Sequence, residues 1–325
     1  MKLHRRKFLQ VATGIAALPA FSRIAHAEVY PSRPVRILVG YTPGGSADIT
    51  ARLIGQWLSE KLGQQFVIEN RPGGGTNIAT EAVVRADPDG YTLLLVPPAA
   101  AINATLYSKL SFDFIKDIEP VAGLNRFPNV VVVNPSLPIK TIPELIAYAK
   151  ENPGKLNMAS SGNGSTIHMS GELFKMLTGI NMVHVAYRGS APALTDMIGG
   201  QVQVMFDNIP TSLEHVRSGK LRGLAVTSLT RSEVLPDLPL VADYLPGYEA
   251  SAWYGIGAPK NTPPEIIDKL NKEINSVLAD PKLKSRFREL GAMELSGSPA
   301  DFKKLIGDET DKWAKVVKFA GAKVD

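Results

Sequence analysis

The feature that most constrains the fold is an order of structural elements that occurs twice along the chain. In residues 35–96, a β-rich segment leads into a glycine-rich loop, a helix, a second strand, a turn with Arg and Gly, a second helix and a third strand. Residues 156–208 contain the same parts in the same order. Strands that alternate with helices are typical of α/β domains. The sequence therefore predicts two similar α/β domains, each a mixed, mainly parallel sheet flanked by helices.

The segments outside the repeats suggest how the two units are joined. A proline-containing joint lies near Arg126, and a second joint follows the proline-rich segment that ends before Ser251. The C-terminal tail has no glycine loop of its own, so we assign it to the first unit. This predicts domain 1 from residues 28–126 plus 251–325 and domain 2 from residues 127–250. Two crossings make a hinge, and the cleft between the domains is the natural ligand site.

The first 27 residues have the three parts of a secretory signal. Basic residues come first, a mostly apolar stretch follows, and Ala25-His26-Ala27 is a small-x-small cleavage site. The run from Arg5 to Leu9 is typical of a twin-arginine signal, although a Sec signal with two chance arginines is the alternative. The apolar stretch is shorter than the about 20 residues that a spanning helix needs. We expect a soluble periplasmic protein after cleavage near Ala27.

Charge and composition exclude several classes of function. The leader holds five of the 36 basic residues, which leaves 31 against 31 acidic ones, so the net charge of +5 does not describe the exported part. A formally neutral chain gives no support to nucleic-acid binding. The absence of cysteine excludes thiolate metal sites and a catalytic thiol. The three histidines after the leader have no partner at metal-ligand spacing, so we predict no metal and no cofactor.

Two loops are candidates for binding an anion. Residues 41–48 and Ser161–Thr166 each lead from a strand into a helix N-terminus, where free N–H groups and the helix dipole favour negative charge. Such loops facing one another across a cleft would hold a small dicarboxylate, or a carboxylate with a polar tail. The alternative is that the glycines only make tight turns and the polar side chains only cap helices. The candidate ligand-binding residues are Thr42, Gly44, Gly45, Ser46, Ala47, Asp48, Asn77, Ser161, Gly162, Gly164, Ser165, Thr166, His168 and Asp207.

Several candidate side chains have two interpretations. Asp48 is expected to cap its helix and shape the first loop. His168 either reaches the cleft or packs, and Asp207 either accepts a ligand hydroxyl or amine or caps the following turn. Arg71 and Arg188 stand in matching positions after strands, where each either binds a carboxylate or braces its loop. His184 is the polar residue in the alternating pattern of a predicted strand, and we expect it to have a structural role.

The sequence lacks the usual signatures of nucleotide binding and catalysis. The glycines at 162 and 164 are not followed by the third glycine of a dinucleotide fingerprint, and no Gly-Lys-Ser/Thr occurs. Ser46 has Gly44 before it but Asp48 after it, so it is not in a nucleophile elbow. We find no nucleophile–base pair and predict no catalytic residues.

The sequence resembles the substrate-binding proteins of tripartite tricarboxylate transporters, also called Bug receptors. The resemblance rests on the combination of motifs Tyr30–Ile37, Pro43–Asp48, Glu69–Ile78, Ala86–Leu93, Tyr187–Gly189, Pro192–Leu194 and Trp253–Gly255 with Ala258–Pro259. It covers nearly all of residues 28–325. It implies a two-domain periplasmic binding protein of the Venus-flytrap, type II-like kind, without catalysis.

The resemblance also implies how such a receptor works. Backbone amides at 44–48 and 161–166 would clamp a ligand carboxylate, often with ordered waters, in a monomer that delivers the ligand to permease subunits in the membrane. The identity of the carboxylate does not carry over. Two alternatives stay open: a sensor that presents its closed form to a signalling partner, and a periplasmic enzyme on the same fold.

Overall fold

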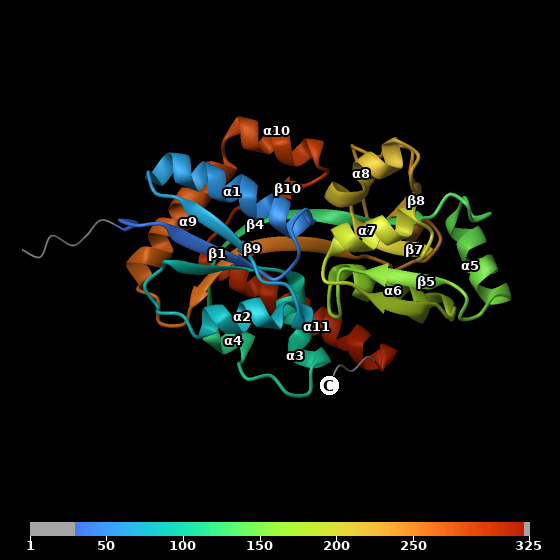
Figure 1. Ribbon diagram of the computed structural model, residues 1–325, viewed down its shortest axis with the longest axis horizontal. Coiled ribbons are helices and arrows are strands. Elements are labelled where there is room, and N and C mark those ends of the chain that lie inside the picture. Colours follow the sequence, from blue (N-terminus) through green and yellow to red (C-terminus); the bar gives the residue numbers. More distant parts are fainter. Residues whose placement is uncertain (1–29, 322–325) are drawn as a thin grey trace, which may run out of the picture.

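The computed structural model describes residues 30–321 (Figure 1). The predicted signal segment, residues 1–27, lies outside the described residues. Ten strands form one curled sheet in which eight follow the order β2-β1-β3-β9-β4-β7-β5-β6, while β8 and β10 pair with β4. None of the helices within residues 30–321 has the length and apolar character that crossing a membrane requires.

The first half is built on three parallel strands. β1 (Val35–Val39) lies between β2 (Phe66–Asn70) and β3 (Thr92–Val96). The helix α1 (Ser46–Leu62) follows β1, and α2 (Asn77–Val84) follows β2 after a short 3-10 turn. Each connection is a strand–helix–parallel strand crossover, which predicts helices on the faces of the sheet.

The second half repeats this arrangement. β5 (Asn157–Ser160) lies between β6 (Val183–Ala186) and β7 (Val204–Asn208), again all parallel. The connecting helices are α6 (Thr166–Thr178) and α7 (Ser190–Ile198). The predicted pair of similar α/β units is therefore confirmed, and each half has its middle strand leading into a glycine loop.

Two long antiparallel strands join the halves and run side by side across the molecule (Figure 1). They are β4 (Ile118–Val133) and β9 (Ser251–Pro259), in which Arg126 pairs with Trp253. Beyond residue 128, β4 leaves β9 and pairs with β7 and with β8 (Arg222–Val226). The sequence pattern favours a strand only over the four valines 130–133, because Pro120, Gly123 and Pro128 disfavour one before them. In the structure, β4 has two register irregularities against β9, one after Pro120 and one after Gly123.

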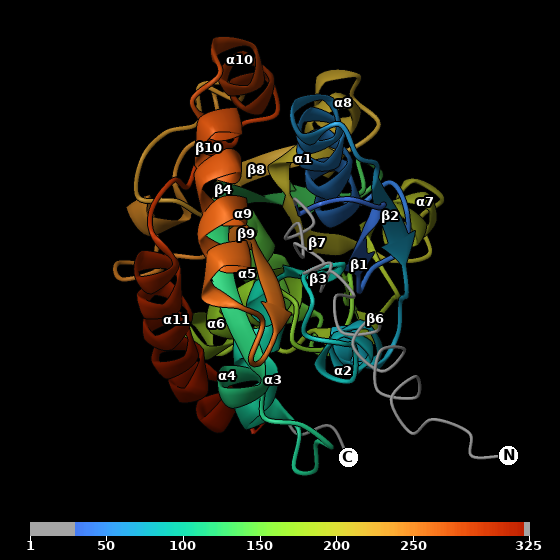
Figure 2. The same cartoon turned by 90° about the vertical axis from the view of Figure 1, so that its left-hand side faces the viewer.

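Helices cover both faces of the first half because its strands alternate. Ile37 packs with α1, α9 (Pro264–Leu278) and α10 (Pro281–Glu289), whereas its neighbour Leu38 packs with α2 and α4 (Phe114–Asp117) on the other face. Figure 2 shows α1 and α10 on one side of the sheet and α2 and α4 on the other. The second half follows the same rule, with α5 (Ile142–Glu151) and α6 on one face and α7 and α8 (Ile209–Arg217) on the other.

Two helices contact both halves. The helix α11 (Pro299–Ala320) packs Phe302 edge-on against Trp253 in the first half, at 5.7 Å between ring centroids, and buries Trp313 in the core of the second half. The helix α3 (Pro98–Leu106) buries Ile102 and Leu106 in that same second core. The sequence analysis did not predict α3, α4, α8 or the two-residue strand β10 (Met293–Glu294). The division into two domains, with the whole tail in the first, stays a prediction.

Candidate ligand-binding site

The first loop is shaped by a carboxylate beneath it. Gly44 adopts a left-handed φ of +82°, whereas Gly45, the N-cap of α1, is extended at φ −80° and has no side-chain cap. The N–H groups of the first turn of α1 therefore have no partner within the helix. The carboxylate of Asp48 turns back and accepts a hydrogen bond from the N–H of Gly44 at 2.9 Å. Asp48 therefore shapes the loop as expected, but the expected side-chain cap of α1 is not found.

Asp48 is also held in its ionised form. Its carboxylate accepts hydrogen bonds from Arg52 and from the amide of Asn70, and it forms an ion pair with Arg52 at 2.9 Å. Burial alone would raise the pKa of Asp48, but the bonds from Arg52, Gly44 and Asn70 outweigh burial and lower that pKa. The side chain is 3% exposed. It is committed to these partners and supports the loop from below.

The second loop is a tighter version of the first. Gly162 and Gly164 both have φ in the left-handed range, at +132° and +75°. Ser165 is the N-cap of α6; its hydroxyl accepts from the N–H of His168 and donates to the carbonyl of Gly162. Ser161 and Thr166 are buried on either side of this turn. A hydroxyl cap and two glycines thus fold the backbone into a compact cradle at the start of α6.

His168 supports this cradle. Its Nδ1 accepts a hydrogen bond from the N–H of Gly164 at 3.3 Å. Its ring stacks on His184 with centroids 3.8 Å apart and planes 12° from parallel, and Nε2 of His184 lies 2.7 Å from Oγ of Ser160. Burial, followed by the charge of Lys175, lowers the pKa of His184 to about 4. Burial also lowers the pKa of His168, as do His184 and Lys175.

The two loops come together from opposite halves. The N–H of Thr42, in the first loop, donates to the carbonyl of Arg188 at 3.2 Å. The hydroxyl of Ser46 donates to Oδ1 of Asn208, at the end of β7, and lies 2.9 Å from the hydroxyl of Tyr254 on β9. Because these contacts join residues of both halves, the two halves are closed against each other in this structure.

A buried chain of side-chain hydrogen bonds continues from this contact. The amide of Asn208 donates to Oδ1 of Asn129 on β4 at 2.6 Å. The amide of Asn129 in turn donates to the hydroxyl of Ser170 on α6 at 2.8 Å. All three side chains are at most 3% exposed. The first turn of α1 is therefore linked, through one crossing strand, to the helix that carries the second loop.

Two cavities lie between the halves and share Tyr41 and Ser161. The inner cavity has a volume of about 10 Å³, room for a single water, and contacts the first turn of α1. The outer cavity, of about 480 Å³, has the size of a small-molecule site. The inner cavity is lined by Tyr41, Gly45, Ser46, Ala47, Ser161, Ser190, Asn208 and Tyr254. The outer one is lined mainly by residues 72–76 and 161–163, with Tyr107, Tyr187 and Arg188.

Five of the fourteen predicted residues, Gly45, Ser46, Ala47, Ser161 and Gly162, line these cavities, and Asp207 and Asn77 are among the nine that do not. Asp207 is fully buried; its Oδ2 accepts from Thr211 and Ser212, and burial raises its pKa despite these bonds. Its Oδ1 has no hydrogen-bond partner within the described part of the chain. Asn77, at the start of α2, accepts a hydrogen bond from Asn103 on α3. Ser190, Asn208 and Tyr254 were not predicted, and Tyr41 was included only as the first residue of the loop 41–48. Ser190 was detectable from the sequence, since it opens a helix after a strand as Ser46 does.

The backbone register corrects the match between Arg71 and Arg188. The N–H of Arg71 donates to the last residue of β1, and it is Tyr187 whose N–H donates to the last residue of β5. Arg188 therefore lies one position further on. Arg71 is paired with Glu69 at 2.6 Å and so braces its own strand, as one of its two interpretations held.

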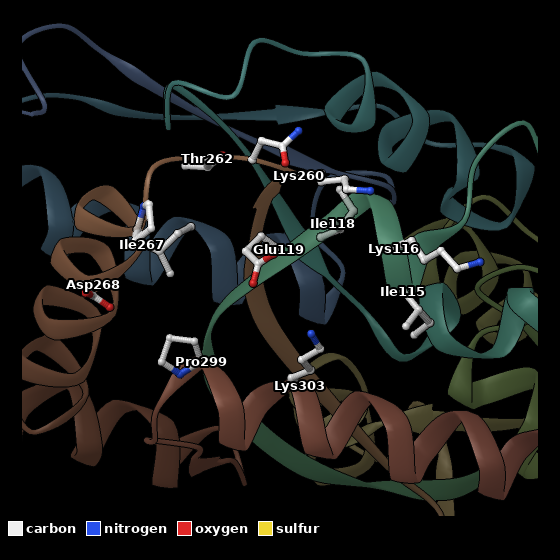
Figure 3. Close-up of a pocket in the computed structure, with 12 residues that line it drawn as sticks. Ile115, Lys116, Ile118, Glu119, Lys260, Thr262, Ile267, Asp268, Pro299 and Lys303 are labelled. Carbon is white, nitrogen blue, oxygen red and sulfur yellow. The ribbon is translucent and has the colours of Figure 1, made fainter.

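A larger cavity, of about 710 Å³, lies away from the loops (Figure 3). Its walls come from α4, the start of β4, the turn after β9 and the first turns of α9 and α11, all in the first half. It contains both acidic side chains, Glu119 and Asp268, and basic ones, including Lys260 and Lys303. Within residues 30–321, no group of three or more His, Cys, Asp or Glu side chains is arranged to hold a metal ion.

Comparisons with known proteins agree with this geometry. Residues 50–322 match the model of the tripartite tricarboxylate transporter family receptor. Protein BugT of Bordetella pertussis is 38% identical over 301 residues, which cover 92% of each chain. A Rhodopseudomonas palustris protein solved with adipate superposes with a TM-score of 0.88 at 40% identity, over 90% of this chain and 98% of its own. The protein MatC of the same species, solved with malate, gives 0.85 at 32% identity, over 89% and 100%.

Two α/β halves joined by paired strands, with helix-opening glycine loops facing one another, define a solute-binding protein of the periplasmic binding-protein fold. The chain belongs to the tripartite tricarboxylate transporter receptor family. The predicted resemblance is thereby confirmed. The family consists of periplasmic solute-binding receptors rather than enzymes.

Proposed function

We propose that this protein captures a small carboxylate between its two halves and delivers it to a tripartite tricarboxylate-type permease. One observation carries the proposal: the glycine loops that open α1 and α6 face each other across a cavity lined by Gly45, Ser46, Ala47 and Ser161. Free N–H groups at a helix N-terminus bind an anion without any charged side chain. The adipate and malate in the related structures support a carboxylate as the ligand class.

The proposal assigns different roles to the predicted residues. The amides of residues 44–48 and 161–166 contact the ligand carboxylate directly or through water. Asp48 and His168 hold the two loops in shape from behind. The inner cavity has the volume of one water in the closed arrangement, so ligand entry requires the halves to separate. The protein acts as a monomer and needs no cofactor.

A thermal-shift screen of the purified protein against carboxylic acids tests this function. A ligand at 100 times its Kd stabilises the bound state by about 2.7 kcal/mol. Each kcal/mol moves the Tm of a protein of this size by roughly 2–4 °C, so a true ligand raises Tm by several degrees. The matched amides and alcohols are the controls. A large shift with a neutral sugar or a cation, and none with any carboxylate, would overturn the proposal.

Delivery to the periplasm is a separate part of the proposal. It rests on the run from Arg5 to Leu9 and on the cleavage site near Ala27. Replacing both Arg5 and Arg6 by Lys should leave precursor in the cytoplasm. Normal export of that double variant would exclude the twin-arginine route and leave a Sec signal.

A sensor that binds the closed receptor remains the alternative to a permease, and co-purification with membrane components distinguishes the two.

A further inference from the structure

The outer cavity carries one positive charge in its wall and no negative charge. Its lining contains one basic residue, Arg188, and no aspartate or glutamate. The rest of the wall includes glycine backbone at residues 73–75, hydroxyl groups and the rings of Tyr41, Tyr107 and Tyr187, with apolar surface from Pro72, Ile78 and Ala186. A cavity with one cation and no acid selects a negatively charged group over a neutral one.

Arg188 is available to a ligand. Within residues 30–321 its guanidinium forms no hydrogen bond and no ion pair, and the only bond assigned to the residue is the one its carbonyl accepts from Thr42. Arg71, by contrast, is neutralised by Glu69, which also pairs with Arg36. Arg188 stands one residue beyond the position that aligns with Arg71, in the turn between β6 and α7. Arg188 lines the cavity between the halves, together with its neighbour Tyr187, whereas Arg71 does not.

Arg188 lines the outer cavity, whereas the first turn of α1 lines the inner one. The inner and outer cavities adjoin at Tyr41 and Ser161. A carboxylate held by the first turn of α1 would thus be continued by a carbon chain into the outer cavity. We propose that Arg188 is a specificity-determining residue, which pairs with a second anionic group at the far end of the ligand. This inference rests on the proposed function, and it adds that diacids are preferred over monoacids of the same length.

The test compares matched acids on matched variants by calorimetric titration. The probes are three pairs that differ in one carboxylate: succinate and butyrate, adipate and hexanoate, terephthalate and benzoate. For at least one pair we expect the wild-type protein to bind the diacid at least about tenfold more tightly, the size of one charge-assisted hydrogen-bonded pair. Arg188→Gln should lose that preference by weakening diacid binding while leaving monoacid binding unchanged.

Arg71→Gln is the control, because it removes the same charge from a residue that is paired and outside the cavity; it should keep the wild-type preference. Circular dichroism and Tm verify that each variant is folded. If the diacid preference survives in Arg188→Gln, or if monoacids bind the wild type as tightly as their diacids, the role of Arg188 is wrong while the carboxylate receptor stands. If no acid of either kind binds the wild type, the proposed function fails and the inference fails with it.

Discussion

The hydroxyl of Ser46, on the first turn of α1, donates a 2.8 Å hydrogen bond to Oδ1 of Asn208, at the end of β7 in the other half of the molecule. Both side chains are 3% exposed. The bond lies in the wall of the inner cavity, where the two halves meet. The amide of Asn208 in turn donates a hydrogen bond to Asn129 on the crossing strand β4. Because Ser46 belongs to the first loop and Asn208 to the other half, closure of the two halves depends on the conformation of that loop.

Removing that hydroxyl should weaken the closed form. In Ser46→Ala, the carbonyl oxygen of the Asn208 side chain loses its donor while it remains buried, which costs about 1–3 kcal/mol. We expect the free energy of unfolding in urea to fall by at most that amount, because separation of the halves gives the oxygen access to water. Ser59→Ala is the control, because it removes a hydroxyl that bonds only within the first half. It should leave the radius of gyration unchanged. Only Ser46→Ala should make the ligand-free protein more extended in solution scattering; equal radii of gyration for both variants would contradict the assignment.

Gly189 offers a way to block closure without straining the backbone. Its φ of 167° is extended, so any residue can adopt it, but a Cβ there would lie 2.1 Å from Oγ1 of Thr42 in the opposite half. Gly189→Ala should therefore fold normally and bind a carboxylate at least about tenfold more weakly, since a methyl group must be accommodated between closely packed atoms. Gly307→Ala, on an open position of α11, is the control. Unchanged affinity in Gly189→Ala would show that the ligand binds without this contact.

Gly45 separates a steric effect on the site from an effect on folding. Its φ is −80°, and a Cβ there would make only ordinary contacts, 3.7 Å from the carbonyl of Thr42 and 4.0 Å from the N–H of Ser190. Gly45→Ala should be tolerated, whereas the extra methyl groups of Gly45→Val enter the space between the halves. We expect Gly45→Val to keep its circular dichroism and lose binding in calorimetric titration. A well-folded Gly45→Val protein with full affinity would move the site elsewhere.

The stacked histidines predict a loss of stability in acid. The pKa of His184 is lowered from 6.5 to about 4, and that of His168 is lowered as well, both chiefly by burial. The unfolded chain therefore binds more protons than the folded one between these values, so the stabilisation is complete above pH 6.5 and is lost as pH falls towards 4. For His184 alone the loss is about 3 kcal/mol. Urea unfolding between pH 7 and 4 measures it, and His184→Gln should flatten the slope; an unchanged slope would assign the effect to other groups.

The fold was predictable where local patterns repeat. The strands 35–39 and 92–96, with the glycine loops after β1 and β5, were recognised because apolar runs and turn residues are local signals. The full length of β4 was not, since Pro120, Gly123 and Pro128 disfavour a strand and only pairing with β9 makes this part of the chain extended. The helix α3 was missed because its burial comes from contacts with the second half.

The candidate site shows the same division. The sequence by itself determined which segments present free N–H groups, because a strand, glycines and a helix start are sufficient for that. It also determined the lack of cysteine and the neutral charge after the leader. Only the tertiary structure decided that Asp48 and His168 turn behind their loops, that Asn208 and Tyr254 meet Ser46, and that Arg188 rather than Arg71 lines the cavity. The physical reason is that the direction of a side chain depends on its register and on partners distant in sequence, neither of which a local pattern contains.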